Sequence, residues 1–510
     1  MTLLHDFLAI SAKRTPDSPA FISGEISTSY GELHEQSSRI AGSLLDLGIK
    51  SGDRVALLLD GCVEYIIAYY GILKAGAVVV PLCTDTRTEI LRTALVHSGA
   101  RALVMEPRNL RYLPKNPGDL PELRHVAVVG KLPEPADDAR LRSFEEMSLN
   151  DAQGTMPPIS PQDLAAINYT SGTTGEPKGV MLSHENLVEN VRSIVEYLRL
   201  TPDDRVAMVL PFYYVYGNSV LHTHIMAGAS VCVAGSLAFP ARLLQTMVKQ
   251  RCTGFSGVPS TFARLLQVKT LSAYDLRALR YVTQAGASMT REVTQKLRSA
   301  LSSAEIFVMY GQTEAAARLA YVPPARLDEK LGSAGRAIPG VTLTIRDKNG
   351  AELPCGIQGE VTAQGRNIMQ GYWNDPVESA RALTPNGLRT GDLGTMDEDG
   401  FLFLVGRDSE MIKSGGHRIA PQKVEDVINR LDGVSECAVT GMNDEILGQA
   451  IVAFVVPDAA IVLNQRAVMK HCTLGLPRFC LPARVHFLSE LPRTATGKLK
   501  RRDLREPITS

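Results

Sequence analysis

Through most of the first 340 residues, short apolar runs alternate with longer segments in which apolar residues recur every three or four positions. A helical pattern over residues 30–48 leads through a turn at residues 51–53 into the apolar run RVALLL at residues 54–59. Strands that alternate with helices favour α/β layering with mainly parallel sheets. Further strand-like runs are found at residues 75–82, 101–106, 125–130, 163–169, 205–210, 230–235, 279–286 and 304–310.

The pattern changes past residue 340. Residues 341–353 and 400–408 predict short strands joined by Gly and Asp turns, which is typical of a smaller β-rich subdomain. After Asp408 the pattern predicts a helix, two strands, a second helix and a final strand, and about 100 residues suffice for a separate small domain. We therefore predict an α/β fold with a large N-terminal domain of layered subdomains over residues 1–407 and a small α+β C-terminal domain over residues 408–510.

Composition narrows the classes of protein to consider. The 54 Lys and Arg residues balance 54 Asp and Glu residues, so no excess positive charge favours nucleic acid or an anionic membrane. No apolar run approaches the ~18 residues of a membrane span. The N-terminal residues 1–17 carry Asp6 inside their apolar stretch and predict an amphipathic helix, not a secretory signal. Eight cysteines without a CxxC pair argue against a disulfide framework and a zinc site, and we expect a cytoplasmic protein.

The most informative segment for chemistry is YTSGTTGEPKGVMLSH, residues 169–184, directly after the apolar run LAAIN. Its glycines and hydroxyl residues surround Lys178, so it offers backbone N–H groups, hydroxyl donors and a cation to a polyphosphate. The P-loop pattern requires Gly-Lys-Ser/Thr, and here Pro177, Lys178 and Gly179 occupy that place. Composition alone would equally describe a solvated linker. The order of the residues is what points to phosphate binding.

In that order, the loop resembles the signature of the adenylate-forming superfamily, which contains acyl-CoA synthetases, peptide-synthetase adenylation domains and firefly luciferase. Other segments resemble further motifs of the same superfamily and occur in the same order. They are QAGASM at residues 284–289, MYGQTE at 309–314, RTGDLG at 389–394, GRDSEMIKSGGHRIAP at 406–421 and PRTATGKLKRRDL at 492–504. So many matches in a fixed order are very improbable by chance.

The resemblance implies a role for each matching residue. Lys498, Thr313 and Glu314 would be catalytic, and Glu314 would hold Mg²⁺, for which a carboxylate is the usual protein ligand. Asp408 would be the hinge of a mobile C-terminal domain, whose rotation would move Lys498 away and bring the loop of His417 toward the site. The residues that would bind ATP or AMP are Thr170, Ser171, Gly172, Thr173, Thr174, Gly175, Lys178, Gly286, Ala287, Ser288, Tyr310, Gly311, Gln312, Thr313, Asp392 and Arg407.

The implied reaction has two steps. The carboxylate of an acid attacks the α-phosphorus of ATP and pyrophosphate leaves, and positioned cations and N–H donors stabilise the developing charge. A thiol then attacks the acyl-adenylate and AMP departs. The thiol belongs either to coenzyme A or to the phosphopantetheine arm of a carrier protein, and the sequence leaves both open. A luciferase-like oxygenase and a nucleotide-binding protein without catalysis are rival interpretations.

The resemblance places the acyl pocket at Tyr213, Tyr214, Val215 and Gly286, although neighbouring tyrosines are more often part of a core. Tyr214 stands where many acyl-CoA synthetases have His, and Val215 stands where amino-acid adenylation domains have an Asp for the ammonium group. An ammonium without a carboxylate partner is poorly held. We therefore favour an aliphatic or aromatic acid without an α-amino group; the alternative is a standalone amino-acid adenylation enzyme that loads a carrier protein.

Overall fold

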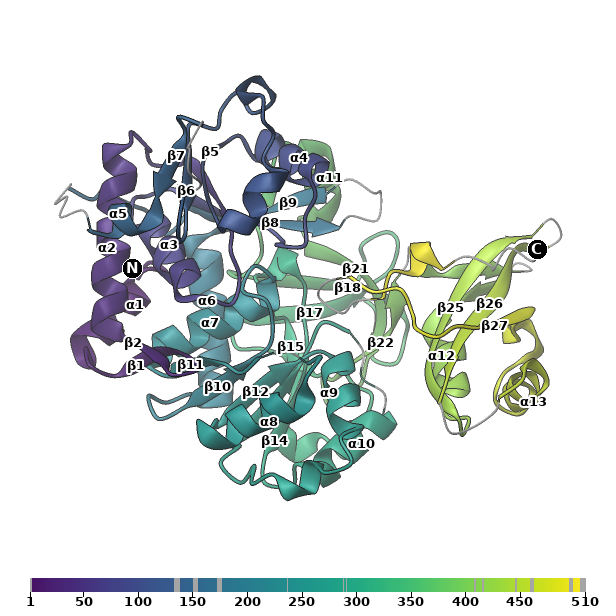
Figure 1. Ribbon diagram of the computed structural model, residues 1–510. Helices are drawn as coiled ribbons and strands as arrows, with labels where there is room; N and C mark the ends of the chain where they lie inside the picture. The colour runs from purple at the N-terminus through teal and green to yellow at the C-terminus, as the bar shows by residue number, and fades with distance from the viewer. Residues whose placement is uncertain are drawn as a thin grey trace. The chain divides into compact units, whose positions relative to one another are not determined.

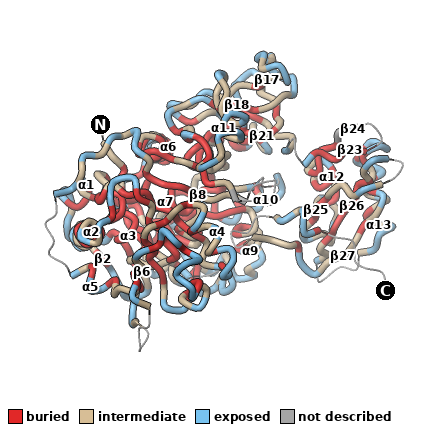
Figure 2. Tube along the Cα trace, turned by 90° about the horizontal axis from the view of Figure 1, so that it is seen from above, coloured by how far each residue is buried: buried red, intermediate tan, exposed pale blue. Residues whose placement is uncertain are grey.

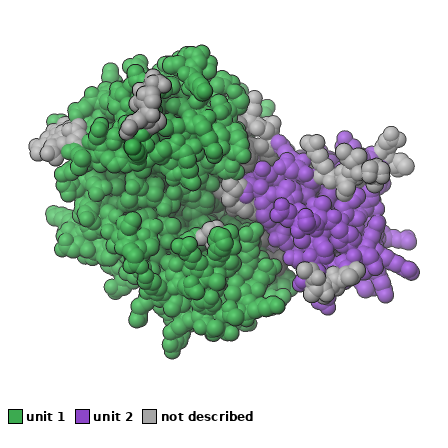
Figure 3. Space-filling view, in the orientation of Figure 1, with its two compact units in different colours: residues 1–331, 335–342, 363–388 green, residues 332–334, 343–362, 389–510 purple. Residues whose placement is uncertain are grey.

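The computed structural model describes residues 2–132, 138–149, 155–171, 177–235, 237–287, 289, 291–407, 410–414, 417–444, 447–458, 463–494 and 499–504. They form two compact units, shown in Figure 3. Unit 1 comprises residues 1–331, 335–342 and 363–388, and unit 2 comprises residues 332–334, 343–362 and 389–510. Asp408 lies outside the described residues, so the predicted domain boundary there stays a prediction.

Unit 1 contains a nine-stranded sheet with the order β16-β15-β14-β13-β12-β10-β11-β1-β2. The six strands from β14 to β1 are parallel, and antiparallel strands close both edges. The mainly parallel sheet predicted from the alternating pattern is therefore confirmed. The strands are β1 (Pro19–Ser23), β2 (Ile26–Ser29), β10 (Arg205–Met208), β11 (Ser230–Val233), β12 (Gly254–Gly257), β13 (Tyr281–Gln284), β14 (Glu305–Tyr310), β15 (Ala320–Val322) and β16 (Arg336–Ala337).

A second sheet of unit 1 has eight strands in the order β19-β9-β8-β4-β3-β5-β6-β7. Its strands from β8 to β7 are parallel, whereas β9 runs antiparallel to β8. The strands are β3 (Arg54–Leu58), β4 (Val78–Pro81), β5 (Ala100–Met105), β6 (His125–Val128), β7 (Leu141–Ser143), β8 (Leu164–Ser171), β9 (Pro177–Ser183) and β19 (Gly371–Tyr372). The sequence did not predict β9, which turns the phosphate-loop segment into a hairpin.

Helices α6 (His184–Leu198) and α7 (Val215–Ala227) lie between the two sheets (Figure 1). α7 packs on β10 and β11, and α6 packs on β9 and on α7. Ser183 begins α6 with a capping box, in which its hydroxyl accepts from the Asn186 N–H and the Asn186 side chain accepts from the Ser183 N–H. α7 is buried on nearly every side, as expected for a helix between layers.

The other helices of unit 1 pack around these layers. The predicted N-terminal amphipathic helix is present as α1 and buries Phe7 and Leu8. The helices that pack around the layers are α1 (Asp6–Arg14), α2 (Tyr30–Asp46), α3 (Val63–Lys74), α4 (Thr88–Ser98), α5 (Phe144–Leu149), α8 (Pro240–Lys249), α9 (Pro259–Leu266), α10 (Arg291–Ala300) and α11 (Pro376–Ala382). Among the described residues, no helix combines the length and apolar character that crossing a membrane demands.

The β-rich region predicted past residue 340 is a five-stranded sheet with the order β17-β18-β21-β20, in which β22 also pairs with β21. The strands are β17 (Val341–Arg346), β18 (Gly359–Gly365), β20 (Leu383–Thr384), β21 (Gly387–Met396) and β22 (Leu402–Arg407).

The C-terminal part of unit 2 is a small α+β structure, as the sequence pattern predicted. Its sheet has the order β24-β23-β26-β25, and β27 pairs with β26. Its core includes Val424, Val439, Ile451 and Val468, which pack the helices on the sheet, and Figure 2 shows the buried stretches of this part of the chain in red. The elements are β23 (Ile412–Ser414), β24 (His417–Ile419), α12 (Pro421–Ile428), β25 (Val434–Asp444), β26 (Gly448–Pro457), α13 (Gln465–Gly475) and β27 (Arg484–Phe487).

Candidate active site

The carboxyl ends of β12, β13 and β14 meet at one edge of the nine-stranded sheet, because these neighbouring strands are parallel. The segment after β13 contains Gly286 and Ala287, and Tyr310 ends β14. Gly286 has φ +92°, and a Cβ there would lie 3.2 Å from the Tyr214 hydroxyl and 3.3 Å from Val258. Gly286 and Tyr214, both predicted for the acyl pocket, therefore lie against each other, and the position requires glycine.

The Gln284 side chain fixes the loop after β13. Its Nε2 donates to the Ala287 carbonyl at 2.6 Å, and only 1% of the residue is exposed. Ser288, predicted for the nucleotide site, lies outside the described residues. The loop is thus closed on itself next to the predicted acyl wall.

A tight turn follows β14 and carries three of the predicted nucleotide-binding residues. A Cβ on Gly311 would stand 2.1 Å from the Ala317 carbonyl oxygen, so only glycine fits there. Gln312 precedes the short helix η4 (Thr313–Ala315), which contains Thr313 and Glu314. Ala316 and Ala317 follow with φ of 53° and 108°, a left-handed conformation that is costly for alanine.

Two buried asparagines from distant segments hold this strained turn in place. Asn190 of α6 donates from Nδ2 to the Arg318 carbonyl at 2.9 Å. Asn367 donates to the carbonyls of Ala315, at 3.1 Å, and of Arg318, at 2.9 Å. A left-handed alanine is strained and persists only where surrounding contacts stabilise it. The contacts of the two asparagines therefore maintain the conformation of this turn. Neither asparagine lies in a motif, so neither was predicted as a site residue.

The Glu314 carboxylate, the predicted magnesium ligand, is oriented by Tyr372. The Tyr372 hydroxyl donates to Glu314 Oε1 at 2.9 Å, and the Met369 N–H donates to the Glu314 carbonyl at 2.9 Å. A carboxylate offers about four lone-pair positions, so one hydrogen bond leaves room for a cation. Hard oxygen donors of this kind suit Mg²⁺. Tyr372 is a site residue that sequence reasoning missed.

Tyr372 also connects Glu314 to the phosphate-loop segment. Lys178 Nζ lies 5.1 Å from the centre of the Tyr372 ring and 2.5 Å from Glu378 Oε2. The hydrogen bond from Lys178 is the main cause that lowers the pKa of Glu378. Two motifs 136 residues apart in the chain, at Lys178 and Glu314, thus meet on the two sides of one tyrosine. Glu378 was not predicted either.

The phosphate-loop segment contains the end of β8 and the whole of β9, and in this hairpin Thr170 pairs with Lys178. Ser171 ends β8. Of the predicted nucleotide-binding residues, Gly172, Thr173, Thr174 and Gly175 lie outside the described residues. The hairpin supplies a reason for the glycine at position 179, because a Cβ there would stand 2.9 Å from Ile167 on the paired strand.

In unit 2, the two predicted ribose residues lie side by side. Asp392 of β21 pairs with Arg407 of β22, and Arg407 Nε lies 3.1 Å from Asp392 Oδ1. Asp392 is buried, whereas Arg407 is exposed, so the pair presents one hydrogen-bond acceptor group and one donor group. Lys498, the predicted catalytic lysine, lies outside the described residues, as does Asp408.

The tyrosines at the start of α7 divide between wall and core. Tyr213, Tyr214 and Val215 are half-buried, whereas Tyr216 is 2% exposed and donates to the Thr283 carbonyl at 2.9 Å. Burial raises the pKa of Tyr213 and of Tyr216 above the ordinary value. Tyr216 is therefore a core residue, whereas the other three stay partly exposed.

The two histidines of α7 are buried separately and have different partners. His222 Nδ1 lies 3.0 Å from the Tyr70 hydroxyl, and His224 Nε2 lies 2.6 Å from the Tyr281 hydroxyl. Burial lowers the pKa of His222 to about 3 and that of His224 to about 4. No cluster of metal-binding side chains is found among the described residues.

Comparisons with known proteins cover almost the whole chain. Residues 8–373 match the family model described as AMP-binding enzyme, and residues 423–498 match the AMP-binding enzyme C-terminal domain. The chain is 31% identical over 506 residues to indoleacetate–CoA ligase of Aromatoleum aromaticum, covering 99% of this chain and 98% of that protein. It is 30% identical over 537 residues to a long-chain-fatty-acid–CoA ligase of Bacillus subtilis, with coverage of 99% and 94%.

Solved structures give the same result at the level of the fold. The anthranilate CoA ligase AuaEII in complex with anthranoyl-AMP matches with a TM-score of 0.90 and 25% identity, over 98% of this chain and 96% of that one. The o-succinylbenzoate CoA synthetase of Bacillus subtilis, in complex with its acyl-adenylate intermediate, matches with a TM-score of 0.85 and 26% identity, over 99% of both chains.

Proposed function

This chain belongs to the AMP-binding enzyme family, and we propose from this premise how its own residues act. It is an AMP-forming acid–thiol ligase, which converts a carboxylic acid to an acyl-adenylate and transfers the acyl group to a thiol. The observation that carries this function is that relatives matched over at least 94% of both chains are, by name, CoA ligases. The edge of the sheet with Gly286, Tyr214 and Glu314 supports it geometrically.

In the first step, the carboxylate oxygen of the acid attacks the α-phosphorus of ATP, and the bond to pyrophosphate breaks. The chain's contribution is to hold the two reactants in line and to supply donors where negative charge develops. We propose that Thr313 and Lys178 contact phosphate oxygens and that Tyr310 lies against the adenine. Glu314, oriented by Tyr372, would hold Mg²⁺, and that ion would neutralise phosphate charge.

The acid is proposed to lie between Gly286 and the half-buried residues Tyr213, Tyr214 and Val215. Val215 offers no charge to an α-ammonium group, so an acid without an α-amino group is favoured. The names of the relatives favour coenzyme A as the acceptor thiol over the arm of a carrier protein. A cytoplasmic location stays a prediction.

Lys498 is proposed to stabilise the transition state of adenylation. Lys498→Ala should lower the rate of acid-dependent pyrophosphate release by about two orders of magnitude or more, because a cation at the developing charge is lost. ATP affinity, measured by calorimetry, should change little. Near-normal adenylation by this variant would contradict the assignment.

The function is tested by pyrophosphate release from ATP with Mg²⁺ across fatty, aryl and amino acids, each with and without coenzyme A. Release with an acid that lacks an α-amino group, accelerated by coenzyme A, is the expected result. Release that coenzyme A leaves unchanged would favour a carrier protein as acceptor. Pyrophosphate release with amino acids and with no other acid would support the amino-acid adenylation alternative. No pyrophosphate release with any acid would contradict the proposed function.

A further inference from the structure

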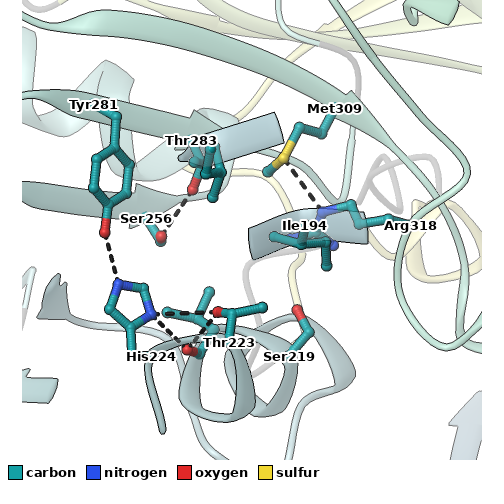
Figure 4. Close-up of a pocket in the computed structure, with 11 residues that line it drawn as sticks. Ile194, Ser219, Thr223, His224, Ser256, Tyr281, Thr283, Met309 and Arg318 are labelled. Atoms are coloured by element: carbon teal, nitrogen blue, oxygen red, sulfur yellow. Dashed lines mark hydrogen bonds between the residues drawn. The ribbon is translucent and has the colours of Figure 1, made fainter. Parts of the chain in front are cut away.

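A small cavity lies behind the predicted acyl wall, between α7 and residues of β12, β13 and β14 (Figure 4). Ser219 and Thr223 of α7 face Ser256 and Thr283 across it, and Arg318 and Met309 line its side. Its volume is about 10 Å³, which is room for roughly one water molecule. None of the reaction steps proposed above uses these residues.

Arg318 is the notable member of this lining, because it is a cation that is only 2% exposed. Its Nη1 donates to the Ala317 carbonyl at 3.0 Å, its Nε lies 3.3 Å from the Met309 sulfur, and its guanidinium lies 4.1 Å from the centre of the Tyr216 ring. All three partners are uncharged. Within the described ranges, none of the ion pairs includes Arg318, so its positive charge is buried without a counter-charge.

A buried charge without a partner is costly, and an anion that binds to it recovers much of that cost. The planar guanidinium suits a carboxylate in particular, since two parallel N–H donors match its two oxygens. Arg318 therefore carries a charge that the fold of unit 1 leaves unmatched and that a ligand can match.

The rest of the lining favours an anion as well. Ser256 and Thr283 are within hydrogen-bond distance of each other at 2.8 Å, and a hydroxyl hydrogen can rotate to donate into the cavity. His224 is engaged, because its Nδ1 lies 2.7 Å from the Val220 carbonyl and its Nε2 accepts from Tyr281. No Asp or Glu is among the residues described as lining the cavity. The site offers donors and one cation, and no competing negative charge.

Backbone and side-chain contacts connect this cavity to the acyl wall. Tyr216 lies two residues after Tyr214, whose hydroxyl is adjacent to Gly286. The Tyr216 hydroxyl bonds to Thr283, three residues before Gly286. Arg318 follows Glu314 by four residues and lies on the turn that the two asparagines hold. The cavity thus lies next to the region in which the acid is proposed to bind.

We propose that the preferred acid carries a second carboxylate at the end away from the reacting carboxyl group, and that Arg318 binds it. This inference rests on the proposed function and names the substrate class of the same site. The second carboxylate occupies the water-sized cavity, and the flexible Met309 side chain moves to make room for the carboxylate. Arg318 is then a specificity-determining residue that binds substrate at a distance from the reacting atoms.

The test compares acids in matched pairs that differ only in the second carboxylate: butanoate with butanedioate, hexanoate with hexanedioate, and benzoate with isophthalate. The measurement is kcat/KM for pyrophosphate release by the full-length protein. We expect one or more diacids to exceed their partners by about 100-fold or more, because a site built around a buried charged donor discriminates strongly against a ligand that lacks the acceptor. Monoacids that react as well as every diacid would overturn the inference.

Two variants and a control separate recognition from structure. Arg318→Met keeps much of the volume and should lower kcat/KM for the diacid about 100-fold, while the monoacid keeps its rate or gains. Arg318→Lys keeps the charge and should retain part of the preference. Arg277→Met makes the same change at an exposed arginine outside the cavity, which pairs with Asp275, and should leave the preference unchanged. Equal losses for both acids in Arg318→Met would show a structural role and would overturn the inference.

If Arg318→Met does not fold, the preference of the unmodified protein for diacids over monoacids still tests the inference. Activity with monoacids but no preference for diacids overturns this inference and leaves the proposed function intact. Absence of pyrophosphate release with every acid would instead contradict the proposed function itself.

Discussion

At the scale of single residues, the site depends on side chains that orient others. The Tyr372 hydroxyl donates a hydrogen bond to Glu314, and the Lys178 ammonium lies over the Tyr372 ring. One tyrosine therefore contacts two groups with opposite charges. The motif residues Glu314 and Lys178 were predictable because their order in the sequence is distinctive. Tyr372 and Glu378 were not, because the contacts that give them a role join segments far apart in the chain.

Removing the charge of Glu314 tests its proposed role. Glu314→Gln keeps the shape of the side chain, and it should lower kcat/KM for acid-dependent pyrophosphate release by about 100-fold or more, with a higher Mg²⁺ concentration needed for half-maximal rate. Tyr372→Phe should cost about tenfold, because it removes one hydrogen bond to a charged group. Glu35→Gln alters an exposed ion pair with Arg39 and serves as the control. Unchanged Mg²⁺ dependence in Glu314→Gln would contradict the assignment.

At the scale of elements, periodicity predicted the strands and helices well, because each buried strand of a parallel sheet is a nearly continuous apolar run. It missed β9, whose residues 177–183 begin in a Gly- and Pro-rich segment and form a strand only by pairing with β8. The turn after β14 was equally hidden. Its left-handed alanines lie in a turn that Asn190 and Asn367 hold through the carbonyl of Arg318.

The turn after β14 makes a prediction about stability. Gly311→Ala should lower the free energy of unfolding by about 3 kcal/mol or prevent folding, because the new Cβ would stand 2.1 Å from the Ala317 carbonyl oxygen, between two carbonyls that the asparagines hold. Gly340→Ala is the matched control, since φ there is +80° with open space around it, and about 1 kcal/mol of backbone strain is expected. Urea unfolding measures both. Equal losses would show that the turn adapts freely.

The buried histidines of α6 and α7 make a prediction about pH. Burial lowers the pKa of His184 and His222 to about 3 and of His224 to about 4, whereas in the unfolded chain each titrates near 6.5. Between these values the unfolded chain binds more protons, so the free energy of unfolding falls as the pH drops from about 6.5 to about 4. We expect a loss of about 1 to 2 kcal/mol per histidine at about pH 5.

Urea unfolding at about pH 7.5 and about pH 5 measures this dependence. His222→Gln removes one of the three buried imidazoles and should reduce the difference in stability between the two pH values, whatever its effect on stability at the higher pH. A difference that remains the same in this variant would assign the acid sensitivity to other groups.

At the scale of the whole molecule, the sequence predicted a large α/β part and a small α+β part, and the match to a solved ligase at a TM-score of 0.90 confirms that fold class. The balance of 54 basic and 54 acidic residues already argued against a nucleic-acid binder. The identity of the acid could not be predicted in this way. It depends on side chains such as Arg318 that lie in no motif and acquire a role only through the packing of α7 against three strands.

The most direct test of the central claim follows one oxygen atom. An acid labelled with a heavy oxygen isotope in its carboxyl group is incubated with ATP, Mg²⁺, coenzyme A and the protein, and the mass of the released AMP is measured. If the carboxylate attacks the α-phosphorus and the thiol then displaces AMP, one labelled oxygen remains on AMP, and this is the result that we expect. Unlabelled AMP, or ADP as the product, would contradict adenylation as the reaction of this enzyme.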